Sequence, residues 1–303
     1  MKAVQFSEYG GPEVLHVVEV DEPHAGPGQV RIAVRAAGVN PSDWKRLAGQ
    51  YREFEEVTFP SGIGVEASGI VDEVGPGVSN VSVGDAVFGC GEHAMAMAQY
   101  AVLTHWAKKP DDLSFEVAGG LPVIADTATR ALDEVGVKSG ETLLVSGASG
   151  GIGSAVLQFA RLRGITVIGT ASAQKHDYLR ELGAIPTTYG PGLAERVREL
   201  APKGVDAALD LAGSGIISEL IEIVGDPSRV LSVADFSAPQ YGAKFSSGPP
   251  KDLERVLADV ARLCSEGLFR LRVEQTFPLE QTVEAQEVSA KGHVTGKLII
   301  SVA

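Results

Sequence analysis

The pattern of hydrophobic and polar positions changes near residue 113. Before it, short runs of β-branched and apolar residues alternate with turns rich in glycine and proline, at intervals of about ten residues. The runs are Leu15–Val20, Val30–Ala37, Ala67–Val74 and Tyr100–Leu103. Many short strands at this spacing predict a β-rich, partly barrel-shaped module over residues 1–112.

Residues 113–267 follow a different pattern, in which helix and strand signals alternate. The alternating segments are Pro122–Val135, Thr142–Ser146, Ser154–Arg163, Thr166–Thr170, Gln174–Leu182, Pro186–Tyr189, Leu193–Leu200, Val205–Asp210, Ile216–Val224, Arg229–Val233 and Leu253–Glu266. This order predicts an α/β domain with a parallel sheet and helices on both faces. Strand signals return at Arg272–Thr276 and Lys297–Val302, around a helix near Leu279–Ala290. We therefore expect residues 268–303 to rejoin the first module.

A glycine-rich turn lies at the start of the alternating region. The apolar run Thr142–Ser146 is followed by Gly147, Gly150, Gly151 and Gly153, and then by a segment with helical spacing of apolar residues. Strand, glycine turn and helix in this order form the setting that a dinucleotide pyrophosphate needs, because glycines let backbone N–H groups reach the phosphate oxygens. The turn therefore predicts a Rossmann doubly wound sheet.

The end of the next strand indicates which dinucleotide binds. In NAD-binding folds a carboxylate about 20 residues after the glycines accepts a hydrogen bond from the ribose 2′-hydroxyl. Residues 169–175 contain neither Asp nor Glu, and they offer Ser172 and Lys175 instead. A hydroxyl and an ammonium suit a 2′-phosphate, so this window favours NADP(H). In the alternative reading, Ser172 caps the next helix and Lys175 is a solvated first-turn residue.

Composition and charge exclude several classes of protein. The chain has 303 residues and a formal net charge of −13, so it lacks the basic face that nucleic acid or an anionic membrane requires. Its two cysteines, Cys90 and Cys264, are far apart and form no CxxC pair. No apolar run approaches the roughly 20 residues of a membrane span, and the first residues lack the apolar core of a secretory signal. We expect a soluble, cytoplasmic protein with a small-molecule substrate.

Several short stretches carry a resemblance that extends over nearly the whole chain. They are Ala36–Asp43 (AAGVNPSD), Gly64–Gly69 (GVEASG), Gly84–Gly89 (GDAVFG), Ser146–Gly153, Val205–Asp210 and Gly292–Ile300 (GHVTGKLII). Together with the order of the two modules, they resemble the medium-chain dehydrogenase/reductases. The resemblance implies a GroES-like, β-rich catalytic domain beside a Rossmann NADP-binding domain.

Two positions separate this chain from the zinc alcohol dehydrogenases of that superfamily. Those enzymes have a zinc-binding cysteine where this chain has Asn40 and a histidine where it has Val65. A catalytic zinc needs three protein ligands of the Cys, His or carboxylate type, and valine cannot serve as one. The chain therefore resembles the zinc-free branch, which contains NADPH-dependent quinone oxidoreductases and their enone-reducing relatives, and we expect no metal.

The resemblance also implies which residues bind the cofactor. The implied contacts are Gly150, Gly151 and Ile152 at the pyrophosphate, Ser172, Lys175 and Tyr189 around the 2′-phosphate, Thr127, Val233 and Ala234 at the nicotinamide end, and Lys297 near the phosphates. Two of these contacts have alternatives, since Tyr189 can be a half-buried aromatic at a strand end and Lys297 can be a surface lysine. Asp210 ends a strand at the carboxyl edge of the predicted sheet, where ligands gather, and it can also simply cap a turn.

The resemblance places Asn40 and Tyr51 at the substrate pocket. The Asn40 amide could hydrogen-bond a substrate carbonyl and stabilise developing negative charge, or it could fix the loop before Pro41. Tyr51 could donate a proton or form an aromatic wall. His93 is a further candidate proton donor by its pKa class, with a surface loop position as the alternative.

The expected activity is zinc-free hydride transfer from NADPH to a quinone or an α,β-unsaturated carbonyl compound. Two alternatives remain open at this point: an enoyl or 2-alkenal reductase of a biosynthetic pathway, and a non-catalytic NADPH-binding sensor or structural protein. By analogy with the family we also expect a homodimer, joined near Leu231–Phe245.

Overall fold

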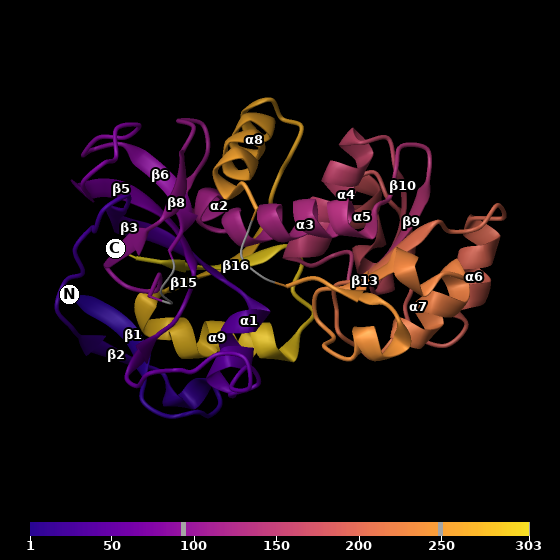
Figure 1. Ribbon diagram of the computed structural model, residues 1–303, viewed down its shortest axis with the longest axis horizontal. Helices are drawn as coiled ribbons and strands as arrows, with labels where there is room; N and C mark the ends of the chain where they lie inside the picture. The colour runs from indigo at the N-terminus through magenta and orange to yellow at the C-terminus, as the bar shows by residue number, and fades with distance from the viewer. Residues whose placement is uncertain (92–94, 248–250, 303) are drawn as a thin grey trace. The chain divides into compact units, whose positions relative to one another are not determined.

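The computed structural model describes residues 1–303 except 92–94, 248–250 and 303, and it divides into two units (Figure 1). Unit 1 comprises Met1–Val123 and Asp252–Ala303, and unit 2 comprises Ile124–Lys251. The sequence pattern predicts boundaries at 112 and 268, so unit 1 is larger than expected on both sides. The reason is that two helices of the alternating region, α2 (Phe115–Gly119) and α8 (Leu253–Ser265), pack on strands of unit 1. The amphipathic pattern of a helix does not specify which sheet it covers.

The described residues of unit 1 form two sheets built mainly from antiparallel pairs. Its described strands are β1 (Lys2–Phe6), β2 (His16–Glu19), β3 (Val30–Val39), β4 (Ser61–Gly62), β5 (Glu66–Val74), β6 (Ala86–Cys90), β7 (Tyr100–Leu103), β8 (His105–Lys108), β15 (Val273–Pro278) and β16 (Lys297–Ser301). The larger sheet has the order β15-β16-β3-β5-β6-β8, with β7 also paired to β3, and the smaller has the order β2-β1-β4. Strand β16 runs antiparallel to β3, so the end of the chain completes the N-terminal module.

The helices of unit 1 close the ends and faces of these sheets. They are α1 (Pro41–Leu47), α2 (Phe115–Gly119), α8 (Leu253–Ser265) and α9 (Thr282–Lys291), with short 3₁₀ turns at Pro12–Val14 and Leu279–Gln281. Ser114 caps α2, because its hydroxyl accepts a hydrogen bond from Val117 N at 3.2 Å. Helix α8 packs on β8, and α9 packs along β15 and β16 (Figure 1).

Strand β3 is the centre of the larger sheet. It pairs with β5 on one side and, along different parts of its length, with β16 and β7. Its side chains alternate between the core and a partly exposed face over the first half, in the period-two pattern of a strand with one buried face. Its last four residues are all buried, and this end leads directly into Asn40 and α1.

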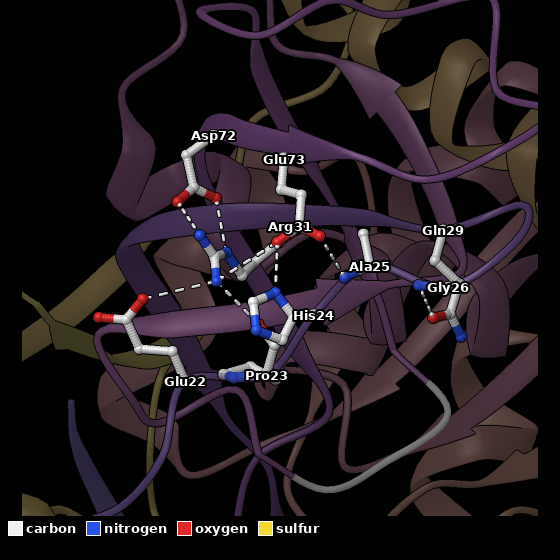
Figure 2. A network of polar contacts seen from close by, with 9 residues as sticks. All are labelled: Glu22, Pro23, His24, Ala25, Gly26, Gln29, Arg31, Asp72 and Glu73. Atoms are coloured by element: carbon white, nitrogen blue, oxygen red, sulfur yellow. Dashed lines mark hydrogen bonds and ion pairs between the residues drawn. The ribbon is translucent and has the colours of Figure 1, made fainter.

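An arginine at the opposite end of β3 fastens the loop that precedes the strand (Figure 2). Arg31 donates two hydrogen bonds to the Asp72 carboxylate, at 3.1 and 2.8 Å, and a third to the carbonyl of Pro23 at 2.9 Å. Its guanidinium also lies 3.5 Å from Glu22 and 3.4 Å from Glu73. This Arg31 cluster joins the loop to β5, because Asp72 and Glu73 belong to that strand.

Unit 2 has the strand order β11-β10-β9-β12-β13-β14, with parallel pairs throughout its described part. The strands are β9 (Thr142–Ser146), β10 (Thr166–Thr170), β11 (Ile185–Thr187), β12 (Ala207–Asp210), β13 (Val230–Ser232) and β14 (Lys244–Phe245). In chain order this is 3-2-1-4-5-6, the order of the doubly wound dinucleotide-binding sheet. The fold class predicted from the sequence is confirmed.

Helices cover both faces of this sheet. They are α3 (Pro122–Val135), α4 (Gly151–Leu162), α5 (His176–Glu181), α6 (Leu193–Leu200) and α7 (Ile217–Val224), with 3₁₀ turns at Ala173–Lys175, Pro227–Arg229 and Ala238–Tyr241. Leu144 joins a core with residues of α6 and α7, and its neighbours Leu143 and Val145, which point to the other face, are also fully buried. No described helix in either unit is long and apolar enough to cross a membrane.

Candidate functional site

A cluster of buried polar side chains lies where β3, β5 and β16 meet. Asn40 follows the last residue of β3, Glu66 is the first residue of β5, and Lys297 is the first residue of β16. Because β3 pairs with both other strands, the sheet brings the three positions together. Asn40 and Lys297 are each 4% exposed, and Glu66 is 0% exposed. The alternative of a surface lysine at 297 is therefore wrong.

The three side chains of this buried polar cluster form a closed set of contacts. The Lys297 ammonium lies 2.7 Å from Glu66 Oε1 and donates a hydrogen bond to Asn40 Oδ1 at 2.5 Å. Asn40 Nδ2 donates to Glu66 Oε1 at 2.8 Å, and Glu66 Oε2 accepts from the backbone N–H of Val123 at 2.8 Å, in the first turn of α3. A buried ion pair needs such additional hydrogen bonds to offset its desolvation. To bind a phosphate, Lys297 would have to exchange these partners.

Asp43 lies next to this cluster on α1. Its Oδ2 atom accepts the backbone N–H of Asn40 at 2.8 Å and a longer hydrogen bond from Gln286 Nε2, on α9, at 3.5 Å. Burial raises the pKa of the Asp43 carboxyl from 3.8 to about 6, against the opposing effect of the Asn40 hydrogen bond. Asn40 therefore does fix the start of α1 through its backbone, while its side chain faces Glu66 and Lys297.

Tyr51 lies in the turn that follows α1 and is half-buried. Burial, assisted by the negative charges of Asp43 and Glu55, raises the pKa of its phenol to about 12. The phenol therefore keeps its proton throughout the physiological range. It can donate a hydrogen bond or form a wall, but it is a weaker acid than an ordinary tyrosine.

The glycine turn of unit 2 connects β9 to α4. Gly147 has a φ of 81°, a conformation that favours glycine. At Gly153 a Cβ atom would lie 2.6 Å from the carbonyl carbon of Ala148, so only glycine lets the helix approach the turn this closely. Helix α4 begins at Gly151, and N–H groups in the first turn of a helix have no intrahelical partner. Those of Gly151 and Ile152 suit the pyrophosphate of a dinucleotide.

The end of β12, the strand next to β9, lies at the same edge of the sheet as the glycine turn. Asp210, at the end of β12, is fully buried and accepts hydrogen bonds from Ala212 N at 3.2 Å, Gly213 N at 3.1 Å and Ser232 Oγ at 2.8 Å. The alternative that Asp210 caps a turn is therefore confirmed. The N–H groups of Val233 and Ala234 bond to Asp210 O and Ser232 Oγ. Because both N–H groups are already used, Val233 and Ala234 could contact a ligand through their carbonyl groups.

The residues expected at the 2′-phosphate follow β10 and β11. Ser172 occupies the N-cap position of a 3₁₀ turn, but its hydroxyl makes no capping hydrogen bond, and Lys175 is half-buried. Tyr189 follows the end of β11 and is 54% exposed. Arg196, which the sequence did not single out, donates to the carbonyls of residues 188, 190 and 191 and so holds the segment around Tyr189.

Thr127 lies on α3 and is buried. Two neighbours on the helix were not expected at a site. Arg130 lies 3.6 Å from Asp126, one turn away, and donates a hydrogen bond to Ser246. Burial raises the pKa of Asp126, although Arg130 opposes this effect. Thr127 is thus flanked by a charged pair that is largely withdrawn from water.

The buried polar cluster is the part of the site that sequence reasoning missed. It named Asn40 and Lys297 separately and did not assign a role to Glu66, Asp43 or Gln286. One usable signal was Gly38, where a Cβ atom would lie 2.7 Å from Glu66 Cδ. Over the described residues no group of three or more His, Cys, Asp or Glu side chains could hold a metal ion. His93 lies outside the described residues.

Comparison with known proteins agrees with this architecture. Residues 26–120 match the alcohol dehydrogenase GroES-like domain, and residues 188–300 match the zinc-binding dehydrogenase family. The chain is 34% identical over 299 residues to the polyketide synthase component PikAII of Streptomyces venezuelae, which covers 91% of this chain but only 8% of that protein. It is 35% identical over 238 residues to a probable quinone oxidoreductase of Leishmania amazonensis, covering 75% of this chain and 67% of that protein.

Solved structures give the same result over the full chain. The quinone oxidoreductase from Coxiella burnetii is 31% identical, with a TM-score of 0.86 and coverage of 100% of this chain and 99% of that one. A mycobacterial protein solved in complex with NADPH is 27% identical, with a TM-score of 0.87 and coverage of 99% of both chains. The chain therefore belongs to the zinc-independent, quinone oxidoreductase-like branch of the medium-chain dehydrogenase/reductases.

Proposed function

We propose that this chain is an NADPH-dependent reductase that transfers hydride, without zinc, to quinones or α,β-unsaturated carbonyl compounds. The observation that carries the proposal is the β9–turn–α4 unit next to β12, where the strand order reverses and where ligands bind in sheets of this kind. Relatives that are quinone oxidoreductases over their full length support the class of acceptor.

The choice of NADPH rests on the segment after β10. Residues 169–175 lack the carboxylate that would select a 2′-hydroxyl, and Ser172 and Lys175 present a hydroxyl and an ammonium instead. Tyr189, which follows β11, is exposed and can cover the adenosine end of the cofactor. The structure of the mycobacterial relative with NADPH supports the same choice.

When bound, NADPH supplies the hydride, which is the difficult part of the chemistry. The protein binds and orients the reactants. First-turn N–H groups of Gly151 and Ile152 would hold the pyrophosphate, and Thr127 with the carbonyls of Val233 and Ala234 would position the nicotinamide end. The Asn40 amide would donate to the substrate oxygen as negative charge develops there. Tyr51 lines the pocket, and solvent supplies the proton.

Steady-state NADPH oxidation tests the proposal, with 1,4-benzoquinone and a panel of alkenals as acceptors and NADH in parallel. We expect turnover with at least one acceptor class and a lower KM for NADPH than for NADH. No turnover with any acceptor, combined with tight NADPH binding, would instead identify a binding protein and overturn the proposal.

Lys175→Ala tests the reading of the 2′-phosphate. Removing the ammonium should raise the KM for NADPH about tenfold or more, the effect of losing one charge-assisted contact, and leave the KM for NADH almost unchanged. Lys203→Ala, at an exposed position of the same unit, is the matched control. An equal effect of Lys175→Ala on both cofactors would show that Lys175 does not contact the 2′-phosphate.

A second candidate function is enoyl reduction on a thioester in a biosynthetic pathway. The match to a segment of PikAII favours it. Comparing kcat/KM for an enoyl thioester with that for 1,4-benzoquinone distinguishes the two, because a quinone reductase should favour the planar ring and an enoyl reductase the thioester.

The proposed assembly is a homodimer joined at the outer edge of the unit 2 sheet. Strand β14 is the last strand in the sheet order, and the Phe236 ring, which is exposed, lies 4.8 Å from the Phe245 ring. An open strand edge with exposed aromatics is suited to pairing with a second copy. Sedimentation equilibrium should give twice the mass of the chain, and a monomer would contradict this part of the proposal.

A further inference from the structure

We propose that Lys297 and Glu66 are positioning residues that fix the direction of the Asn40 amide, so that one of its N–H bonds is offered to the substrate oxygen. This inference rests on the proposed function, in which Asn40 contacts the substrate. It assigns a role in the reaction to two residues to which the proposed function gives no cofactor or substrate contact.

The partners of the amide leave only one orientation available to it. An ammonium can only donate hydrogen bonds, and an ionised carboxylate can only accept them. Lys297 therefore has to face Asn40 Oδ1, and Glu66 has to face Asn40 Nδ2, as the contacts at 2.5 and 2.8 Å record. A reversed amide would place its NH₂ group against the ammonium and its oxygen against the carboxylate. Both contacts would be repulsive.

This arrangement uses one of the two N–H bonds of the Asn40 amide in a protein hydrogen bond and leaves the second one available to a ligand. Oδ1 is occupied by Lys297, and one Nδ2 hydrogen is donated to Glu66. The second Nδ2 hydrogen has no protein acceptor within the described part of the chain. It is the donor that the proposed function requires.

Glu66 is itself held at both oxygens. Oε1 takes the Asn40 and Lys297 contacts, while Oε2 accepts the backbone N–H of Val123 in the first turn of α3. A carboxylate at a helix N-terminus is further stabilised by the helix dipole. The carboxylate is therefore a rigid reference point for the amide.

Two glycines provide the space for the ion pair. A Cβ atom at Gly38, within β3, would lie 2.7 Å from Glu66 Cδ, and one at Gly120 would lie 2.9 Å from Lys297 Cγ. Glycine inside a strand weakens it, so a glycine there indicates a close approach by another group. A buried ion pair is also poor evidence of stabilisation by itself, because apolar side chains often serve equally well. Control of the Asn40 amide gives the pair a function.

A double-mutant cycle in kcat tests the inference. The variants are Asn40→Ala, the neutral pair Glu66→Gln with Lys297→Met, and all three substitutions together. The neutral pair leaves no unpaired buried charge, and a glutamine at 66 accepts either amide orientation. We expect it to lower kcat about tenfold to a hundredfold, as for a misdirected oxyanion donor, with little change in the KM for NADPH. In the Asn40→Ala background the same pair should have no further effect.

Independent, multiplying losses in kcat would overturn the inference, because they would show that the ion pair does not act through Asn40. Arg31→Ala is the matched control. It removes a charged side chain from the other end of β3 and should leave kcat unchanged. Urea unfolding of each variant identifies losses that come from folding.

Gly38→Ala provides a second test if the neutral pair does not fold. The added methyl group displaces the Glu66 carboxylate without changing any charge. It should lower kcat, and again only while Asn40 is present. Wild-type kcat in Gly38→Ala would overturn this inference and leave the proposed function intact. Wild-type kcat in Asn40→Ala would overturn this inference together with the substrate contact of Asn40, but not the proposed reductase activity. Absence of turnover by the wild type with every acceptor would overturn both.

Discussion

The two ends of the β3–β5 strand pair both carry charged clusters, but only at one end are the charges of both signs withdrawn from water. At one end Arg31 is surrounded by Asp72, Glu73 and Glu22, whose side chains are 28%, 31% and 48% exposed (Figure 2). At the other end Lys297 and Glu66 are buried, with Asn40 between them. Arg31 itself is only 12% exposed, but its carboxylate partners are partly solvated, whereas both members of the Lys297–Glu66 pair are buried.

Exposure determines what each cluster can do. Exposed charges are screened and contribute little per pair, whereas a buried charge must keep its partner or lose much of its solvation energy. The Arg31 cluster can therefore fasten a loop and tolerate change. The buried polar cluster can impose one geometry on a neutral amide, because a reversed amide would place its NH₂ group against the Lys297 ammonium and its oxygen against the Glu66 carboxylate.

The largest effect on the free energy of unfolding should come from removing only one member of the buried Lys297–Glu66 pair. Lys297→Met leaves Glu66 charged and unpaired, and we expect a loss of about 3–5 kcal/mol in the free energy of unfolding. The neutral pair Glu66→Gln with Lys297→Met should recover most of that loss. Urea unfolding monitored by circular dichroism measures both. A single variant as stable as the wild type would show that the pair is hydrated.

The buried end should also give the protein a pH dependence. The pKa of Asp43 is raised to about 6 by burial, so between pH 4 and pH 6 the folded state holds a proton that the unfolded state has released. This stabilisation is complete below pH 4 and is lost as the pH rises through 6. The difference between the unfolded and the folded pKa of Asp43 corresponds to about 3 kcal/mol. Asp43→Asn should flatten this part of the stability curve, and an unchanged curve would contradict the assignment to Asp43.

A smaller effect is expected at the exposed end. Arg31→Ala should lower the free energy of unfolding by about 1 kcal/mol, because each of its partners is partly solvated. The loss should shrink in about 0.5 M salt, which screens exposed charges, whereas the effect of Lys297→Met should not. Arg31→Lys should retain part of the stability but not the bidentate contact with Asp72. Equal salt dependence at the two ends would contradict the comparison.

The smallest effect concerns Glu73, whose pKa is lowered mainly by the side-chain hydrogen bond with His24. A carboxyl with a lowered pKa contributes stability above its unfolded pKa of about 4.5 and loses it as the pH falls. This sign is opposite to that of Asp43. His24→Ala should move the Glu73 titration, followed by NMR, back towards higher pH. A midpoint that does not move would exclude His24 as the cause.

Local patterns predicted most of the elements but not all of them. The structure has the predicted bounds for two helices and one strand, because each is a full period-3.6 or apolar run with clear ends. They are Pro122–Val135, Leu193–Leu200 and Thr142–Ser146. Helix α1 was missed. It has seven residues and begins at a proline, too short for its apolar positions to show a period. Helix α4 starts three residues earlier than expected, because close packing at Gly153 outweighs the poor helix propensity of its glycines.

The two parts of the candidate site differ in the same way. The glycine turn could be predicted from the sequence, because its function depends on the backbone of consecutive residues and only glycine adopts the conformation that the turn requires. The buried polar cluster was not, because its members are common residue types far apart in the chain. Asn40 and Glu66 are 26 positions apart, and Asn40 and Lys297 are 257 positions apart.

The family resemblance indicated that Asn40 and Val65 stand where zinc alcohol dehydrogenases have two zinc ligands. By itself the sequence determined the two kinds of domain, the position of the dinucleotide turn and the absence of a carboxylate after β10. These are properties of short segments, and short-range sterics and chemistry suffice to read them. Only the tertiary structure decided that Lys297 is buried and that Glu66 holds it against Asn40. Strand pairing between distant segments sets these contacts, and the loss of solvent at their meeting point sets their strength.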